Sequence, residues 1–428
     1  MTIAAFHQLS IDGADFDVRV ERVTIDQALH ARDAIEVMGE VVTAGGEPAL
    51  DAETLIGSRA NITLAGELGA ELGGVISAVS RHGSTGVTFV IGHPVTALRH
   101  TCDHRVFVDA DVVAIAEQVL GDHGIQIETR IDQPPEPRMQ CVQSFESDLD
   151  IVSRILAEEG IAWFVERSAD GAGQLVLADH PAAFQPIEGD DRLPYGADEG
   201  LLAPESVSSG TLRYRLQHDR ITLGDSWFEN PALDLTATTK AGAGTLEHYA
   251  YPGPNRYRDP DTGKQLAGRW LEMLRADTLV LEGVSTCPRL AAGRTFVLQG
   301  APRDDLNRRW LVVALSSTSR ERHGEPDAPR FEAGFVAVPA DLAWRPAITR
   351  PPTVGGVQSA VVTGPNGPEI HTDAYGRVKA HLRWDRRGPE DDSSSAWMRV
   401  VHPQLSGGFL LPRVGWEVLL GFGGPSGD

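Results

Sequence analysis

The chain has 428 residues, a length that predicts about three domains, and its 41% apolar and 23% charged residues are typical of an ordinary globular protein. Its 38 basic and 60 acidic residues give a formal net charge of −22, so binding of DNA or RNA by the surface as a whole is not expected. No stretch approaches the roughly 18 consecutive apolar residues of a membrane-spanning helix.

The cysteines Cys102, Cys141 and Cys287 are odd in number and far apart in the sequence. This pattern argues against a disulfide framework and a structural zinc site, and it favours a reducing compartment. Residues 1–7 lack a basic segment followed by an apolar one, so we expect no secretory signal peptide.

Short strands are predicted throughout residues 1–100. Phe16, Val18 and Val20 alternate with charged neighbours, which is the period of a half-buried strand, and residues 87–91 repeat the alternation. We therefore predict a β-barrel or β-sandwich for this part of the chain.

The next region, 101–200, is predicted to be α/β. Apolar residues at helical spacing follow Asp111, a good N-cap, and predict a helix over 111–122. A second helix should begin at Ser147, in a capping-box variant with Asp three residues later, and end at Gly160 in the left-handed conformation. The strands expected after it are 161–165 and 175–177.

Residues 201–338 are predicted to be a second mainly β region that contains one helix. Thr262 and Gln265 have the spacing of a capping box, and apolar residues on one face predict a helix over 262–276. The strands expected after it are 279–281 and 295–298.

A proline-rich segment, 339–358, is predicted to be a semi-rigid linker. The segment 359–428 beyond it shows about five strands, a number that suits a small OB-fold barrel. Asn366-Gly367 is a strong hairpin-turn signal, and apolar residues alternate over 414–422 in the last strand.

A nucleophile was sought at Gly224-Asp225-Ser226, which resembles the nucleophile block of some hydrolases. The flanking pattern of those enzymes is absent, and no particular histidine or aspartate is indicated as a partner of Ser226. A plain β-turn is the alternative interpretation.

His100, Cys102 and His104 could project three metal ligands from one face of a strand. The flanking Arg99 and Arg105 disfavour a cation, so a solvated strand face is the alternative. The acidic residues of 259–263 lack the later ligands of an EF-hand, and a calcium loop is rejected.

The one basic patch runs from Arg377 to Arg387 and could follow a nucleic-acid backbone on an OB-fold. Trp384 falls on the apolar side of the alternation, however, so it is expected in the core. A charged outer face, or a salt-bridged subunit contact with the acidic remainder, is the alternative. The residues alone therefore assign no catalytic, cofactor-binding or metal-binding side chain.

Several segments share the pattern of one family, in the same order. They are Cys141–Ile161, Leu175–Phe184, Tyr251–Gly253, Arg256–Tyr257, Ile370–Lys379, Trp384–Arg386, Ser395–Val400 and Pro412–Val418. Together they resemble the VgrG spike proteins of type VI secretion.

The resemblance implies a fold that is mainly β with some α. It would contain two β-barrels and a small α/β region, as in phage tail hubs, followed by an OB-fold. It also implies a homotrimer, related to the hub and puncturing spike of contractile phage tails. Three chains with two similar barrels each would form six units that can dock on a hexameric, Hcp-like tube.

The implied partners are this tube, baseplate proteins, and effector or adaptor proteins. The implied role is mechanical, without enzymatic activity, cofactor, metal or nucleic acid, and the target membrane would be met only by the assembled spike. Such a protein would assemble in the cytoplasm and be translocated at the tip of the apparatus.

The segment Gly423–Asp428 stands where the family continues through an acidic turn into a last OB strand and a needle. We therefore expect the OB-fold to lack its last strand, either because the chain is shortened or because another chain supplies the needle. The rival interpretations are the hub of an extracellular phage-tail-like particle, a hydrolase centred on Ser226, and a nucleic-acid-binding OB protein.

Overall fold

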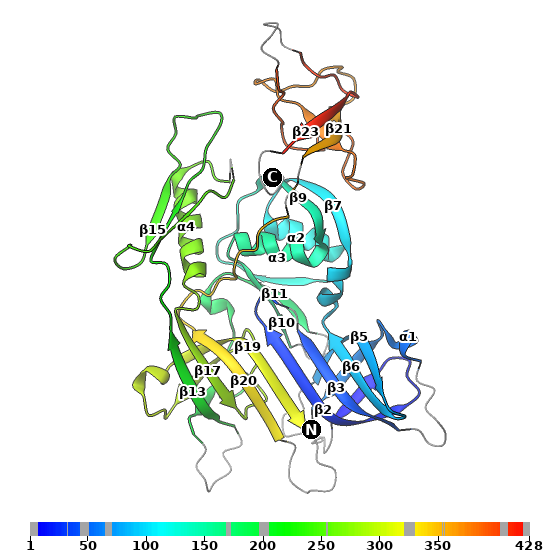
Figure 1. Cartoon of the computed structure of the whole chain (residues 1–428), viewed down its shortest axis with the longest axis vertical. Coiled ribbons are helices and arrows are strands. Elements are labelled where there is room, and N and C mark those ends of the chain that lie inside the picture. Colours follow the sequence, from blue (N-terminus) through cyan, green and yellow to red (C-terminus); the bar gives the residue numbers. More distant parts are fainter. Residues whose placement is uncertain are drawn as a thin grey trace.

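An elongated arrangement of layers is seen in the computed structural model. A broad sheet lies at one end, an α/β region lies above it, and a C-terminal module lies at the other end (Figure 1). The structure describes residues 7–31, 33–42, 51–64, 71–167, 173–196, 205–253, 256–320, 330–352, 354, 356–402 and 410–422.

The broad sheet contains strands from the beginning and from the end of the segment 8–339. These are β1 (Gln8–Ile11), β2 (Asp17–Ala28), β3 (Ala34–Val42), β4 (Arg59–Thr63), β5 (Glu71–His82), β6 (Gly86–Gly92), β12 (Arg192–Pro194), β13 (Val207–Tyr214), β17 (Leu279–Ser285), β18 (Thr295–Gln299), β19 (Arg309–Arg320) and β20 (Arg330–Pro339). They pair in the order β1-β4-β5-β6-β3-β2-β19-β20-β17-β13, and β18 pairs with both β19 and β12.

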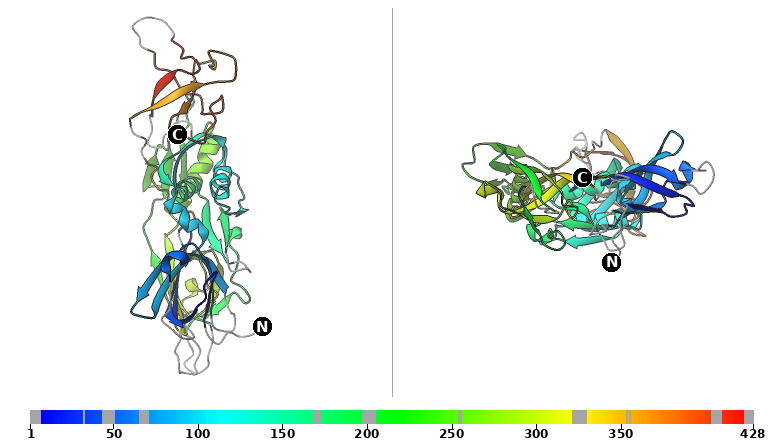
Figure 2. Two further views of the ribbon diagram at one scale, coloured as in Figure 1. Left: turned by 90° about the vertical axis from the view of Figure 1, so that its right-hand side faces the viewer. Right: turned by 90° about the horizontal axis from the view of Figure 1, so that it is seen from below.

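Two halves of this sheet meet where β2 pairs with β19, with Ala28 opposite Ala314. They lie side by side in Figure 1 and toward opposite sides when the molecule is seen from below (Figure 2). The predicted first and second β regions are therefore joined edge to edge in one sheet.

Each half encloses its own apolar core. In the first half, the alternation predicted at 87–91 is confirmed, because Val87, Phe89 and Ile91 are buried. In the second half, Phe296 and Phe335 pack edge to face with ring centroids 5.5 Å apart.

The second half also returns on itself. From β19 the pairing runs through β18 to β12, and the next residue, Tyr195, bridges to Val207 at the start of β13. The amide of Gly196 donates to the Val207 carbonyl at 2.8 Å, which strengthens this contact. The six strands of this half thus form a ring.

The α/β region contains the two predicted helices. Its elements are β7 (Cys102–Ala110), α2 (Val112–Gly121), β8 (Ile127–Arg130), β9 (Arg138–Ser147), α3 (Asp148–Glu158), β10 (Ala162–Glu166) and β11 (Gln174–Ala178). β7 and β9 form an antiparallel ribbon, and β10, β11 and β8 form a small sheet.

The predicted helix caps of this region are confirmed. The Asp111 carboxylate accepts from the amides of Val113 and Ala114 at 2.9 Å, and Ser147 Oγ accepts from the Asp150 amide at 3.1 Å. Gly160 follows α3 with φ +72°, the left-handed value predicted for it.

A separate unit, here called the α4 unit, stands beside the α/β region (Figure 1). It comprises β14 (Arg220–Leu223), β15 (Ala237–Lys240), β16 (Glu247–Ala250) and α4 (Pro260–Leu274). The predicted cap at Thr262 is wrong: the helix begins earlier, because Asp259 accepts from the Thr262 amide at 2.9 Å and Pro260 occupies the first helical turn. The remaining short helices are α1 (Ala52–Leu55), η1 (Pro94–His100), η2 (Pro181–Ala183) and η3 (Asp304–Leu306).

The C-terminal module begins at residue 357, after a connection over 340–356 that carries most of the predicted linker prolines. Its strands β21 (Val357–Thr363), β22 (Lys379–Leu382) and β23 (Glu417–Gly421) form a sheet in the order β22-β21-β23. The expectation of about five strands is not met within the described residues.

Two further expectations about the C-terminal module are revised. Pro339 ends β20 rather than starting the linker. Asn366-Gly367 lies within the long 364–378 connection of β21 to β22, so it is not a two-residue hairpin. The predicted chain end at Gly423–Asp428 lies outside the described residues.

Candidate functional site at the base of the C-terminal module

Ser226 has no base beside it among the described residues. Its Oγ lies 2.9 Å from the Tyr251 hydroxyl oxygen, and its amide donates to the Asp225 carboxylate at 2.6 Å. Asp225 in turn accepts from the Tyr257 amide at 2.9 Å. The carboxylate therefore orders the backbone of this loop.

The three candidate metal ligands face different surroundings. His100 ends η1 and accepts a hydrogen bond from the neighbouring arginine at 3.0 Å, and Cys102 is exposed at the start of β7. The His104 ring packs against Phe145 and Trp384, with centroids 4.6 and 5.8 Å apart. Over the described ranges, no three His, Cys, Asp or Glu side chains are grouped as a metal site.

The predicted basic patch is largely occupied by carboxylates of the same chain. Arg386 and Arg387 pair with Asp103, and Arg377 pairs with Glu229. These salt bridges form within one chain, whereas the predicted alternative was a salt-bridged contact between subunits. Trp384 packs against the core of the C-terminal module, as predicted.

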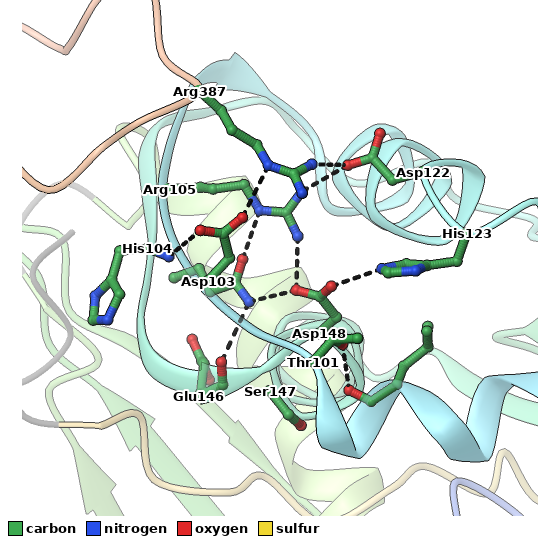
Figure 3. A network of polar contacts seen from close by, with 12 residues as sticks. Thr101, Asp103, His104, Arg105, Asp122, His123, Glu146, Ser147, Asp148 and Arg387 are labelled. Carbon is green, nitrogen blue, oxygen red and sulfur yellow. Dashed lines mark hydrogen bonds and ion pairs between the residues drawn. The ribbon is translucent and has the colours of Figure 1, made fainter.

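Arg386 and Arg387 hold the C-terminal module on the β7–β9 ribbon through Asp103, and Figure 3 shows Arg387 in this contact. Arg386 donates through Nε and Nη2 to the two oxygens of Asp103 at 3.0 and 3.1 Å. Arg387 Nε lies 2.9 Å from Asp103 Oδ2. The bidentate geometry fixes orientation as well as distance.

Backbone hydrogen bonds reinforce this contact. The buried Asp385 carboxylate accepts from the Val106 amide at 3.1 Å and from the Gly388 amide at 2.8 Å. The Gln140 side chain accepts from the Ala396 amide at 3.1 Å. We call Asp103, Val106, Asp122 and Gln140 the seat.

Beneath the seat lies a buried polar network centred on Arg105 (Figure 3). Arg105 donates to Gln143 at 2.8 Å, to Asp122 at 2.9 Å and to Asp148 at 2.7 Å. Asp122 also accepts from Arg387 at 2.5 Å. One carboxylate thus joins the buried network to the C-terminal module.

Two carboxyl groups of the site, those of Asp148 and Asp103, have lowered pKa values. Burial raises the pKa of Asp148, but hydrogen bonds from Gln143 and His123 and the charge of Arg105 outweigh it and lower that pKa. Burial likewise raises the pKa of Asp103, and the hydrogen bond and charge of Arg386 bring it below its usual range. The site therefore stays charged at neutral pH.

A second cluster joins the end of α3 to the α4 unit. Glu159 is paired with Arg256, with Arg269 at 3.3 Å and with Arg138 at 3.3 Å. Burial raises the pKa of Glu159, but the charges of Arg256 and Arg138 outweigh burial and lower this pKa to about 2. The Trp270 indole donates to the Glu158 carbonyl at 3.1 Å.

Sequence reasoning missed the seat and the network. Arg105 was considered only as a neighbour of the candidate metal ligands. The one available signal was charge: a basic segment, 377–387, in a strongly acidic chain. Taken together, the contacts of the site hold the C-terminal module against the α/β region.

The chain matches a known family over most of its hub. Residues 37–322 match the family described as "Phage tail baseplate hub (GPD)". The Pseudomonas aeruginosa protein named "Type VI secretion system spike protein VgrG5" is 37% identical over 346 residues, which cover 75% of this chain and 43% of that protein. The chain belongs to the VgrG family of phage-tail-like hub proteins.

A second VgrG relative extends the match. The Vibrio cholerae protein named "Type VI secretion system spike protein VgrG3" is 29% identical over 402 residues, which cover 87% of this chain and 38% of that protein. The chain spans less than half the length of either relative. The resemblance found in the sequence segments is confirmed.

Solved structures agree on the VgrG fold. An E. coli protein, c3393, described as a type VI secretion component similar to the T4 tail proteins gp27 and gp5, has a TM-score of 0.70 at 18% identity, covering 98% of this chain and 97% of that one. A chain of the structure described as a Francisella PdpA-VgrG complex has a TM-score of 0.58 at 7% identity, covering 96% of this chain and 75% of that one. The mainly β, phage-hub-like fold is confirmed. Over the described residues, no helix is long and apolar enough to cross a membrane.

Proposed function

We propose that this chain is the trimeric hub of a type VI contractile injection machine, which caps the inner tube and carries the spike. Family membership carries this proposal, because the likeness to a type VI secretion component spans almost the whole chain, from the broad sheet to the C-terminal module.

The C-terminal module supports threefold association. Its sheet buries Ala360, Ala380 and Leu382 on one face, yet Val357 and Leu419 on the strands are 60% and 74% exposed. A sheet with apolar side chains on both faces needs a cover on the second face. Neighbouring copies of the same module would supply it in a closed trimer.

The two halves of the broad sheet support docking on a sixfold tube. One half has its own core and the other returns on itself as a ring, so each can serve as one barrel-like unit. Three chains then present six such units to a hexameric, Hcp-like tube without a symmetry mismatch.

In this proposal the C-terminal module is an OB-fold. The three strands and the additional bridge between Val378 and Met398 support this assignment. In the proposal the module leads toward a needle, and the seat keeps it aligned with the hub.

The proposed partners are the tube, baseplate proteins, and effectors or their adaptors. A solved structure that contains a chain of this fold is described as a PdpA-VgrG complex, which supports a protein partner for the hub. The chain would assemble in the cytoplasm and leave at the tip of the apparatus. In this proposal the chain makes and breaks no covalent bonds. The pairing of the Ser226 hydroxyl with the Tyr251 hydroxyl supports this view.

Solution mass is the first test of the proposal. For the chain joined to its needle we expect a trimer, with about 138 kDa from three copies of this 46.1 kDa chain plus the mass of the needle, and six density lobes around the axis by electron microscopy. A purely monomeric needle-bearing chain, or a ring without six similar lobes, would refute the trimeric hub. Deleting the gene next to type VI sheath genes should abolish export of the tube protein; unaffected export would favour an extracellular particle.

A further inference from the structure

The loop Gly224–Glu229 reaches from the α4 unit to the C-terminal module. The Arg377 guanidinium lies over the Phe228 ring, 4.4 Å from its centroid, and the Tyr375 ring meets Phe228 edge to face at 5.4 Å. Glu229 pairs with Arg377 at 3.3 Å. Phe228, which lies far from the seat residues in the sequence, thus contacts the module through cation–π and aromatic interactions.

The same loop is anchored in the α4 unit. Trp227 lies beside Phe228, with centroids 6.0 Å apart, and the Arg258 guanidinium covers Trp227 at 4.6 Å. The Asp225 carboxylate accepts from the Ser226 and Tyr257 amides, and the Tyr257 side chain is fully buried. The Asp-Ser pair that resembles a hydrolase motif therefore shapes the loop that presents Phe228.

The α/β region, the α4 unit and the C-terminal module each contact the other two. The α/β region holds the α4 unit through Glu159 and Arg269, and it holds the C-terminal module through the seat. The α4 unit holds the module through Phe228. A body attached at one patch can tilt about that patch, whereas a second attachment at a distance removes the tilt.

We propose that the Gly224–Glu229 loop is a brace that fixes the direction of the C-terminal module, with Phe228 as its contact and Asp225 as its positioning residue. Without the brace, the module stays on the seat but tilts about the 340–356 connection. The inference concerns contacts within one chain, so it does not depend on the trimer or on the tube.

Spin-label distances test the brace in the whole chain. Labels at Glu117→Cys on α2 and Glu390→Cys on the module, in a Cys102→Ser background diluted into excess unlabelled chain, report the angle between the two parts. The two remaining cysteines are buried. We expect a narrow distance distribution in the parent chain and one about twice as broad in Phe228→Ala, because slow collective tilting becomes allowed.

Matched variants separate the brace from a general loss of structure. Arg377→Ala should broaden the distribution as Phe228→Ala does. The double variant should add nothing, since both substitutions remove the same contact between Arg377 and Phe228. Leu216→Ala, at an exposed apolar side chain just before β14, should leave it unchanged. Asp225→Asn should broaden it partly, whereas Ser226→Ala should not.

Unchanged widths in Phe228→Ala and Arg377→Ala, with native circular dichroism, would overturn the brace. Equal broadening in Leu216→Ala would overturn it too, because the effect would then reflect the α4 unit as a whole. A monomeric solution mass would count against the trimeric hub and leave these distances interpretable.

Discussion

The α/β region and the C-terminal module of this chain have different interiors. Helices α2 and α3 bury long apolar side chains such as Ile115 and Ile155, and the charged Arg154 beside them is only 2% exposed. In the C-terminal module, the fully buried core cluster over the described residues contains two alanines and Leu382.

This difference shows where each region obtains its stability. Burial contributes roughly 25 cal/mol per Å² of apolar surface, so a core with few large side chains gains little from folding alone. The α/β region can be stable by itself, whereas the module depends on the seat, on the brace and, in the proposed assembly, on its neighbours.

The largest expected effect on the free energy of unfolding comes from a substitution in the interior of the α/β region. Arg154 donates to Glu146 at 2.6 and 3.0 Å and to the Val142 carbonyl at 3.1 Å. Arg154→Met removes the charge and the donors that face the buried Glu146 carboxylate and the Val142 carbonyl, so we expect a loss of about 3–5 kcal/mol in the free energy of unfolding. Urea denaturation followed by tryptophan fluorescence measures it.

The control for this prediction is the same substitution at an exposed ion pair. Arg303 pairs with Asp305 at the surface, where such pairs contribute about 0–1 kcal/mol. Arg303→Met should therefore leave the urea midpoint nearly unchanged. Equal losses in the two variants would show that burial of Arg154 is not the cause.

The next effect concerns association and sharpens the contrast with the C-terminal module. Leu419→Ser should leave the unfolding of the single chain within about 0.5 kcal/mol, because this side chain is already exposed. In the proposed trimer it loses an apolar contact worth about 2 kcal/mol per subunit. Sedimentation of the needle-bearing chain should show dissociation at higher concentration; a trimer as tight as the parent would place Leu419 outside the interface.

A smaller effect is expected at the seat. Asp103→Asn keeps the shape of the side chain but removes the charge that holds Arg386 and Arg387. We expect docking of the module to weaken by about 1–2 kcal/mol, since both guanidinium groups are partly exposed. Hydrogen exchange of the 384–396 amides should become faster, while the amides of α3 should not change.

The seat also predicts a direction of pH dependence. Asp103 and Asp148 have lowered pKa values in the folded chain, so their contribution is fully present above the unfolded-state pKa of about 3.9 and is lost as the pH falls through the folded values. Protection of 384–396 should therefore be constant from neutral pH to about pH 5 and fall below about pH 4. Loss of protection between pH 6 and 7 would contradict this assignment.

Local features of the fold could be predicted because they depend on neighbouring residues. Asp111 and Ser147 cap their helices as the sequence indicates, and Gly160 takes the predicted backbone conformation. The cap of α4 was placed at Thr262 because the acidic residues before it were tested only as calcium ligands, although Asp259 before Pro260 is itself a strong start signal.

Pairings over long distances could not be predicted from one sequence. Arg387 and Asp122 are 265 residues apart, and each has many opposite charges to choose from in a chain with 98 basic and acidic residues (38 + 60). The pairing of β2 with β19, which joins the two halves of the sheet, has the same character. Periodicity predicts that a strand exists, but it does not predict which edge the strand meets.

The smallest expected effect is that of Ser226→Ala, and it decides between chemistry and mechanics. The Ser226 hydroxyl contacts only the exposed Tyr251 hydroxyl among the described partners, while the amide that binds Asp225 is kept by alanine. We expect a change in unfolding free energy within about 0.5 kcal/mol and unchanged export of the tube protein. Asp225→Asn is the informative comparison, because it disturbs the loop without removing the hydroxyl. If Ser226→Ala abolished function while Asp225→Asn did not, the hydroxyl would be a reacting group and the loop would not act as a brace. The contacts of Phe228 predict the opposite, a larger effect of Asp225→Asn than of Ser226→Ala.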